Sequence, residues 1–270
     1  MVELFSKDQV DPNRQSSKGN QLKFRKDGIW YKTDYLGYEG LAEFVISKML
    51  SCSNLSPDEY ADYSLEKISY HGNVFHGCSS RDFTKGWQLI TLERLFQKAF
   101  GHGVNQVYLN APGHRECLRL LVEYTEKITG IQDFGAYMSK MITIDTFFLN
   151  EDRHAHNMAV MTNHLGEYKL APFFDQGASL LSDTTLDYPL GQETLKLIPR
   201  ARPKTFCNDF DEQLDIAEEL YGQHLRFAFG YNDVKRIVDQ AGQYSAEARN
   251  RVLEIIMQRR RKFGYLFDLN

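Results

Sequence analysis

The chain has 270 residues, of which 42% are hydrophobic and 25% are charged, and its formal net charge at pH 7 is −4. The length suits one large domain or two lobes, and the composition is that of an ordinary globular protein. The acidic balance excludes the basic footprint that is typical of a nucleic-acid-binding protein.

The four cysteines are far apart in the sequence and form no Cys-x-x-Cys pair. They are Cys52, Cys78, Cys117 and Cys207. We therefore expect free thiols in a reducing compartment and no structural zinc site. The N-terminus lacks the apolar stretch of a secretory signal peptide, and no uncharged run reaches the length that crosses a membrane. We expect a cytoplasmic protein with no membrane partner, while secretion by a route that needs no signal peptide stays open.

The first part of the chain predicts a polar arm followed by a hairpin. Residues 1–20 are rich in Ser, Lys, Gln and Asn, which indicates a mobile arm that ends in a loop. Two alternating runs, 21–25 and 29–32, lie on either side of Asp27-Gly28. Asp-Gly between alternating runs is a strong signal for a tight β-hairpin.

The next elements complete a small N-terminal lobe. Apolar residues at helical spacing predict a helix over residues 38–50. Two further strands are predicted over residues 64–70 and 74–78. We expect residues 1–80 to form a β-rich N-lobe.

The pattern after residue 81 is mostly helical. The predicted helices cover residues 91–100, 115–129, 134–149, 209–221, 231–240 and 245–263. Residues 134–149 are apolar nearly all round, as expected for a helix at the centre of a lobe. We predict a helical C-lobe over residues 81–270, and for the whole chain an α+β fold with two lobes.

The most informative motifs follow the central helix. Asp152-Arg153-His154-Ala155-His156-Asn157 comes first, and Asp175-Gln176-Gly177 begins eighteen residues after Asn157. Two short β-like runs, 158–161 and 168–170, separate the two motifs. A hairpin of this kind returns the chain to its start, so we expect Asn157 and Asp175 to face one cation.

These residue types suit phosphoryl transfer. Mg²⁺ prefers oxygen ligands from one or two carboxylates together with phosphates and waters. Kinases place an Asp in a catalytic loop, an Asn five residues later and a separate Asp before a Gly. We assign Asp152 as the catalytic base and Asn157 and Asp175 as the magnesium ligands. Gly177 leaves the turn after Asp175 open to a positive φ.

The predicted N-lobe offers partners for ATP. Lys32 lies at the end of a strand and Glu43 follows eleven residues later in the helix, an order that matches the kinase Lys–Glu pair. Glu39, one turn earlier, is the competing partner. The loop at residues 17–20, with Gly19, is expected to cover the phosphates through its backbone N–H groups.

Other polar residues are assigned to binding or to structure. We expect residues 77–80 to end the sheet and to form the hinge against the adenine, with Cys78 and Ser79 as nucleotide contacts. Arg153 is expected to pair structurally near the catalytic loop. The basic run at 258–262 is interpreted as a solvated helix end.

The motif Asp152-Arg153-His154-x-x-Asn157 with Asp175-Gln176-Gly177 resembles the catalytic and metal-binding motifs of the HipA-like serine/threonine kinases. That family is distantly related in fold to the phosphatidylinositol kinases, which share an Asp-Arg-His-x-x-Asn loop. The order of Lys23, Asp27-Gly28-x-Trp30-x-Lys32 and an Ala42-Glu43 helix is similar as well. The resemblance covers roughly residues 14 to 265 and concerns the compact members, which lack a separate N-terminal subdomain.

The resemblance implies a protein kinase that uses ATP and Mg²⁺ and acts on Ser or Thr of a protein substrate. Because a Ser in the N-terminal loop is an autophosphorylation site in this family, Ser16 and Ser17 become candidates. Two alternatives stay open. One is a lipid or small-molecule kinase, and the other is a pseudokinase that acts as a binding module.

Overall fold

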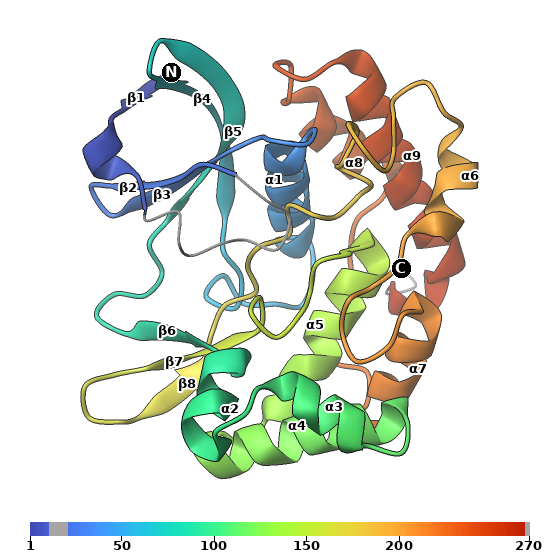
Figure 1. The fold of residues 1–270 in the computed structure, drawn as a ribbon. Helices are drawn as coiled ribbons and strands as arrows, with labels where there is room; N and C mark the ends of the chain where they lie inside the picture. The colour runs from blue at the N-terminus through green and yellow to red at the C-terminus, as the bar shows by residue number, and fades with distance from the viewer. Residues whose placement is uncertain (11–20, 268–270) are drawn as a thin grey trace. The chain divides into compact units, whose positions relative to one another are not determined.

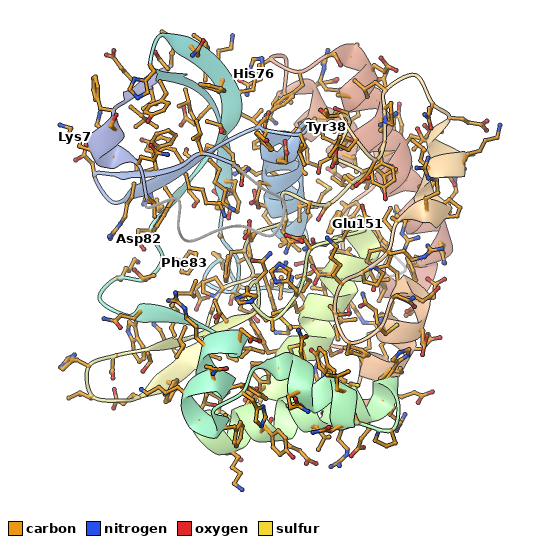
Figure 2. All side chains as sticks on the ribbon, in the orientation of Figure 1. Lys7, Tyr38, His76, Asp82, Phe83 and Glu151 are labelled. Carbon is orange, nitrogen blue, oxygen red and sulfur yellow. The ribbon has the colours of Figure 1, made fainter. Side chains whose placement is uncertain are left out.

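The computed structural model describes residues 1–10 and 21–267. The chain groups into two compact units, and each is described by itself. Unit 1 comprises Met1–Phe83, Phe174–Ala201 and Arg226–Asn270, and unit 2 comprises Thr84–Phe173 and Arg202–Leu225. Asp82 and Phe83, labelled in Figure 2, stand at the end of the first segment of unit 1.

Unit 1 contains a five-stranded sheet in the order β1-β4-β5-β3-β2 (Figure 1). Its strands are β1 (Val2–Leu4), β2 (Lys23–Lys26), β3 (Ile29–Thr33), β4 (Tyr63–Tyr70) and β5 (Asn73–Arg81). All neighbouring strands are antiparallel except β1 and β4, which are parallel. The four strands predicted in this region are confirmed. The mobile arm is wrong for residues 1–10, because they form β1 and a short 3-10 helix, η1 (Ser6–Asp8).

The sheet curls around a core of its own. Leu4, Phe24, Tyr31 and Ile68 form one buried cluster, although β1 and β2, which carry Leu4 and Phe24, are the two edge strands. Strands curl in this way when one face is apolar and can be folded onto itself. This arrangement explains why the N-terminal residues are ordered, since Leu4 completes the core.

Helix α1 (Glu39–Leu50) packs against β3, β4 and β5, on the face that carries Lys32. The close approach of α1 to β5 depends on glycine. A Cβ at Gly40 would lie 2.7 Å from the backbone carbon of Gly77 in β5. The predicted helix is therefore confirmed, and its position brings its side chains within reach of the sheet.

The remaining helices of unit 1 follow Phe174 in the chain. They are α6 (Thr194–Leu197), η2 (Ile198–Arg200), α8 (Tyr231–Asp239), α9 (Ala246–Lys262) and η3 (Gly264–Leu266). Helix α8 packs on both α1 and α9. The predicted solvated helix end at 258–262 is wrong in part, because Arg259 is buried and stacks 4.6 Å from the Phe263 ring.

Unit 2 combines a three-stranded antiparallel sheet with five helices among its described residues (Figure 1). The strands are β6 (Gln88–Thr91), β7 (Ala159–Thr162) and β8 (Tyr168–Leu170); the helices are α2 (Leu92–Phe100), α3 (Val104–Asn110), α4 (His114–Thr129), α5 (Phe134–Phe148) and α7 (Phe210–Tyr221). The predicted hairpin β7–β8 is confirmed, while β6 and α3 were not predicted. Helix α5 is buried over almost its whole length and packs against α4 and α7, as its apolar sequence predicts.

The described elements make a mixed α/β protein. In the described ranges, no helix is both long enough and apolar enough to span a bilayer. The compact units do not coincide with the predicted lobes, because residues 174–201 and 226–270 group with the N-terminal sheet. The functional division at residue 80 stays a prediction.

Candidate active site

Lys32 lies at the centre of a charged cluster in unit 1. Its Nζ donates to Glu43 Oε1 at 2.6 Å and to Asp175 Oδ1 at 2.7 Å. Lys23 is the cross-strand neighbour of Lys32, and its Nζ lies 4.0 Å from Asp175 Oδ2. Two ammonium groups and two carboxylates therefore lie together, although Asp175 is far along the chain from the other three.

The cluster keeps Lys32 charged. Burial lowers the pKa of Lys32, but the carboxylates of Asp175 and Glu43 outweigh burial and hold that pKa well above its ordinary value. The Glu43 side chain is only 1% exposed, and its second oxygen accepts the backbone N–H of Gln176 at 2.8 Å. Glu43 thus joins the Lys32 ammonium to the backbone that follows Asp175.

Glu39, the competing partner of Lys32, has a different role. Its carboxylate accepts the backbone N–H groups of Leu36 and Gly37 at 2.7 and 3.1 Å. A carboxylate that binds free N–H groups before a helix stabilises the start of that helix. Glu43 is therefore the partner of Lys32, as predicted, and Glu39 supports the turn into α1.

Asp175 itself adopts the left-handed backbone conformation, with a φ of 61°. Gly177, which leaves the turn open to a positive φ, does not adopt one. Asp tolerates this region better than most residues because its short side chain bonds locally. The strained residue is the predicted metal ligand and not the glycine after it.

Strain continues beyond Asp175. The buried residues Leu180 and Leu181 have φ values of 55° and 57°, which bulky residues rarely adopt. The segment is held by Tyr38, whose hydroxyl donates to the carbonyl of Leu180 at 2.6 Å, and by Ser182, whose hydroxyl donates to the carbonyl of Gly177 at 2.6 Å. Backbone strain of this kind persists where the surroundings enforce it and is concentrated at functional sites.

Residues 77–80, the expected hinge, lie in the last part of β5, which ends at Arg81, and the hinge role stays a prediction. Cys78 pairs with Lys32 in the register and lies in the middle of the sheet. Ser79 points to the other face, where its hydroxyl donates to Glu66 Oε1 at 2.9 Å. Side chains alternate along a strand, so the side chains of Ser79 and Lys32 cannot contact the same group on one face. Gly19, Ser16 and Ser17 lie outside the described residues.

Unit 2 builds the predicted catalytic loop, residues 152–157, on a buried ion pair. Helix α5 ends at Phe148, and the next residue, Leu149, has a φ of 59° where the chain turns into the loop. The Arg153 guanidinium donates to both oxygens of Asp145 in α5, at 2.9 and 3.1 Å, and to the carbonyl of Asn157 at 2.9 Å. Arg153 therefore connects the helix with the far end of the loop, which confirms its predicted structural role.

Asp152 and Asn157 face each other across this loop. The Asn157 amide nitrogen donates to the Asp152 carbonyl at 2.8 Å and to Asp152 Oδ2 at 3.2 Å. Because the NH₂ group faces two acceptors, the orientation of the amide is fixed and its oxygen is directed away from them. The amide oxygen of Asn157 is thus the atom that suits a metal ion.

Two further side chains approach Asp152. Lys204 Nζ lies 3.6 Å and His154 Nε2 lies 3.7 Å from Asp152 Oδ1. The segment with Lys204 is attached to the loop a second time, because the Arg202 backbone N–H donates to Glu151 Oε1 at 3.0 Å. Glu151 is labelled in Figure 2. Nothing in the local motif predicts Lys204, which comes close to Asp152 only through the fold of unit 2.

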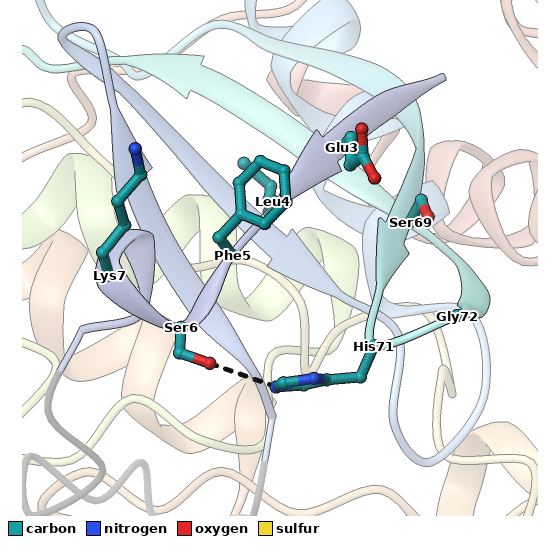
Figure 3. A pocket seen from close by; sticks show the side chains of 8 residues that line it. All are labelled: Glu3, Leu4, Phe5, Ser6, Lys7, Ser69, His71 and Gly72. Carbon is teal, nitrogen blue, oxygen red and sulfur yellow. Dashed lines mark hydrogen bonds between the residues drawn. The ribbon is translucent and has the colours of Figure 1, made fainter.

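A separate pocket of about 680 Å³ lies at the N-terminal edge of the sheet in unit 1. Figure 3 shows Leu4, Phe5, Ser6 and His71 among its lining residues, with Ser6 Oγ 3.2 Å from His71 Nε2. None of the predicted site residues lines this pocket. The volume of this pocket is therefore no reason to connect it with the chemistry that the motifs indicate.

The similarity between this chain and known proteins is found when their structures are compared. No family model matches the sequence, and no curated protein matches it significantly. The fold is similar to the crystal structure of a Helicobacter pylori proinflammatory kinase, CtkA, with a TM-score of 0.61 and 15% sequence identity. The alignment covers 92% of this chain and 89% of that chain. The chain thus has the mixed α/β fold of a solved kinase structure, and at this identity the likeness concerns the fold alone.

Proposed function

We propose that this chain is a kinase that uses ATP and Mg²⁺ to phosphorylate Ser or Thr of a protein substrate, and that it also phosphorylates itself. The proposal rests on the Lys32 ammonium, which lies within 2.7 Å of both Glu43 and Asp175. A strand Lys held by a helix Glu beside the Asp of an Asp-x-Gly motif is the arrangement that kinases use at the ATP phosphates. The likeness in fold to a kinase supports the same proposal.

The roles follow from the chemistry of each group. Lys32, kept charged by its carboxylate neighbours, binds phosphate oxygens. Asp175 and the amide oxygen of Asn157 provide ligands for Mg²⁺, which prefers oxygen atoms. Asp152 orients the acceptor hydroxyl and accepts its proton, the role of the loop Asp in protein kinases. Magnesium, when bound, neutralises the charge of the transferred phosphoryl group.

The backbone around these residues supports a fixed geometry. Arg153 and Asp145 hold the loop from beneath, and the Asn157 amide is oriented by Asp152. On the other unit, Glu43 binds Lys32 and the Gln176 backbone at once. Phosphoryl transfer depends mainly on positioning and electrostatics, so side chains locked in this manner suit the reaction.

The lipid-kinase alternative has less support. It needs a basic face near a membrane, and the tail at 258–262 was the candidate for that face. Within this tail, Arg259 is buried, and Arg260 donates through Nε to the Phe229 carbonyl at 3.1 Å. The guanidinium groups of Arg259 and Arg260 therefore contact other parts of the protein and do not form an open basic surface.

The test is incubation of the purified protein with Mg²⁺ and labelled ATP, with and without a cell lysate, followed by mass-spectrometric mapping of phosphosites. We expect phosphate on Ser or Thr of protein, including Ser16 or Ser17. The Asp152→Asn variant should lower transfer by at least about 100-fold, since a positioned general base contributes that much. Asp62→Asn, a change at an exposed carboxylate of unit 1, is the control and should keep native turnover.

A thermal-shift titration with Mg²⁺ and ATP separates binding from transfer. Binding without any transfer would favour the pseudokinase, and transfer to lipid but not to protein would favour the lipid kinase. If Asp152→Asn kept near-native transfer, the assignment of the base would be wrong. Lys32→Met should weaken nucleotide binding, whereas Asp152→Asn should leave it intact.

A further inference from the structure

Three side chains that the proposed function does not use come together in unit 2. They are His114, the first residue of α4, Cys207, and Glu212 in the first turn of α7. Their ligand-type atoms all lie within 4.8 Å of one another. His114 Nδ1 is 2.6 Å from Glu212 Oε1, and Cys207 Sγ is 3.7 Å from Glu212 Oε2.

We propose that His114, Cys207 and Glu212 bind one Zn²⁺ ion. Thiolate, imidazole and carboxylate are the three ligand types that zinc takes in proteins. Bond lengths of about 2.0–2.3 Å to a tetrahedral ion place neighbouring ligand atoms roughly 3.3–3.6 Å apart. The sulfur and the carboxylate oxygen are already near that separation, and the imidazole and carboxylate need to part by less than about 1 Å.

The hydrogen bond between His114 and Glu212 lies where the ion would enter. To bind zinc, the imidazole releases its Nδ1 proton to solvent and takes one up at Nε2, so that Nδ1 offers a lone pair to the ion. Glu212 Oε1 then offers zinc the lone pair that accepted the hydrogen bond. Cys207 has a backbone donor of its own, because the Asp209 N–H lies 3.2 Å from its sulfur. A backbone N–H aimed at sulfur stabilises a thiolate, the form that binds a metal.

Zinc binds the Cys207 thiolate, so the thiol proton passes to solvent as the Zn–S bond forms.

The N-terminal ends of α4 and α7 determine how much each of the three ligands should contribute to zinc affinity. The first turns of α4 and α7 carry partial positive charge, which opposes a cation at this place. The two anionic ligands must offset both the helix ends and the ion. Loss of Cys207 or Glu212 should therefore weaken binding more than loss of the neutral His114.

The site also connects with the catalytic loop through the chain. Cys207 follows the segment in which Arg202 and Lys204 contact Glu151 and Asp152. Zinc would fix this segment to the start of α4. We therefore expect metal binding to raise the thermal stability of the protein, independently of any nucleotide.

The experiment is a Zn²⁺ titration of metal-free full-length protein in competition with a chromophoric chelator. We expect one equivalent to bind and to raise the melting temperature. Removal of a second-shell partner already costs zinc sites about 10–100-fold in affinity. Cys207→Ser and Glu212→Gln should therefore lower affinity by at least about 100-fold, and His114→Gln by a smaller factor.

Matched controls are available in the same unit. Cys117→Ser changes another buried thiol and His102→Gln another exposed imidazole, and both should bind zinc as the wild type does. Cobalt in place of zinc should give a thiolate-to-metal charge-transfer band that Cys207→Ser abolishes. Absence of a bound equivalent, or binding that survives both Cys207→Ser and Glu212→Gln, would overturn the proposal.

Discussion

The ion pair between Arg153 and Asp145 makes a sharp prediction about the catalytic loop. Both side chains are almost fully buried, with 2% and 0% of their surfaces exposed. Burial raises the pKa of Asp145 even though Arg153 acts in the opposite direction. The loss of hydration on burial therefore destabilises the Asp145 carboxylate more than the attraction to Arg153 stabilises it, as is common for buried pairs.

Breaking the pair from one side should be severe. Arg153→Met leaves a buried carboxylate, and Asp145→Leu leaves a buried guanidinium. Removal of one partner of a buried pair costs about 3–5 kcal/mol. At about 2–4 °C per kcal/mol for a protein of this size class, the melting temperature should fall by roughly 6–20 °C.

The double variant Asp145→Leu/Arg153→Met should recover much of that loss, because no uncompensated charge remains. Urea unfolding of the four proteins gives the coupling energy, which we expect to exceed about 2 kcal/mol. Phosphate transfer should stay low in the double variant, because the Arg153 bond to the Asn157 carbonyl is gone. Arg119→Met, which breaks an exposed pair on α4, should barely change stability.

A coupling energy below about 0.5 kcal/mol, the usual limit of additivity, would refute this reasoning. So would a double variant as unstable as the two single losses combined. Full transfer activity in a stable double variant would refute the positioning role of Arg153 while leaving the electrostatic argument in place.

Three further predictions concern other residues. Glu43→Gln should weaken Mg²⁺-ATP binding in a thermal-shift titration, while Glu39→Gln should lower the melting temperature and leave that affinity unchanged; equal loss of affinity in both would contradict the assignment. Burial raises the pKa of Asp34 to about 7, so the folded state keeps a proton that the unfolded chain releases. This contribution to stability is full below about pH 4 and is lost as pH rises to about 7. Asp34→Asn should remove that slope from unfolding measured across pH, and an unchanged slope would exclude the group. Lys204→Ala should lower phosphate transfer by about 10–100-fold with Lys204→Arg partly active; equal loss in both would favour a different role.

The local patterns predicted most of the secondary structure. The hairpin at Asp27-Gly28 is present, with φ values of 50° and 74° at the two residues. The apolar helix at 134–149 and the hairpin after it are present as well. These elements depend on turn chemistry and on the spacing of apolar residues, which a single sequence displays.

The Lys32–Glu43 contact was also predictable, because strand and helix are neighbours in the chain and the motif sets their spacing. The positive φ at Asp175 was not. It depends on Tyr38 and Ser182, which hold the following segment through bonds to Leu180 and Gly177. The glycine in the motif did not indicate this residue, since glycine permits a positive φ but does not require it.

Contacts between distant segments escaped prediction. Asp145 is an acidic residue in a mostly apolar stretch of α5, and this was an available signal for a buried partner. Lys204 and the cluster of His114, Cys207 and Glu212 give no local signal, because they meet only after α4, α5 and α7 pack. The regular structure of residues 1–10 likewise depends on Leu4, which completes a buried cluster that includes residues of β2 and β4.

The charged cluster around Asp175 has one more consequence. Lys23, Lys32, Glu43 and Asp175 together carry no net formal charge. A bare divalent ion therefore meets a carboxylate whose attraction is already cancelled by its ammonium neighbours. If a nucleotide bound together with its metal ion, its phosphate oxygens would pair with the lysine ammonium groups, and the metal ion would bind the carboxylate. The nucleotide-free protein should accordingly not bind free magnesium. It should bind magnesium only together with a nucleotide, when the ion replaces the ammonium groups as the partner of the carboxylate.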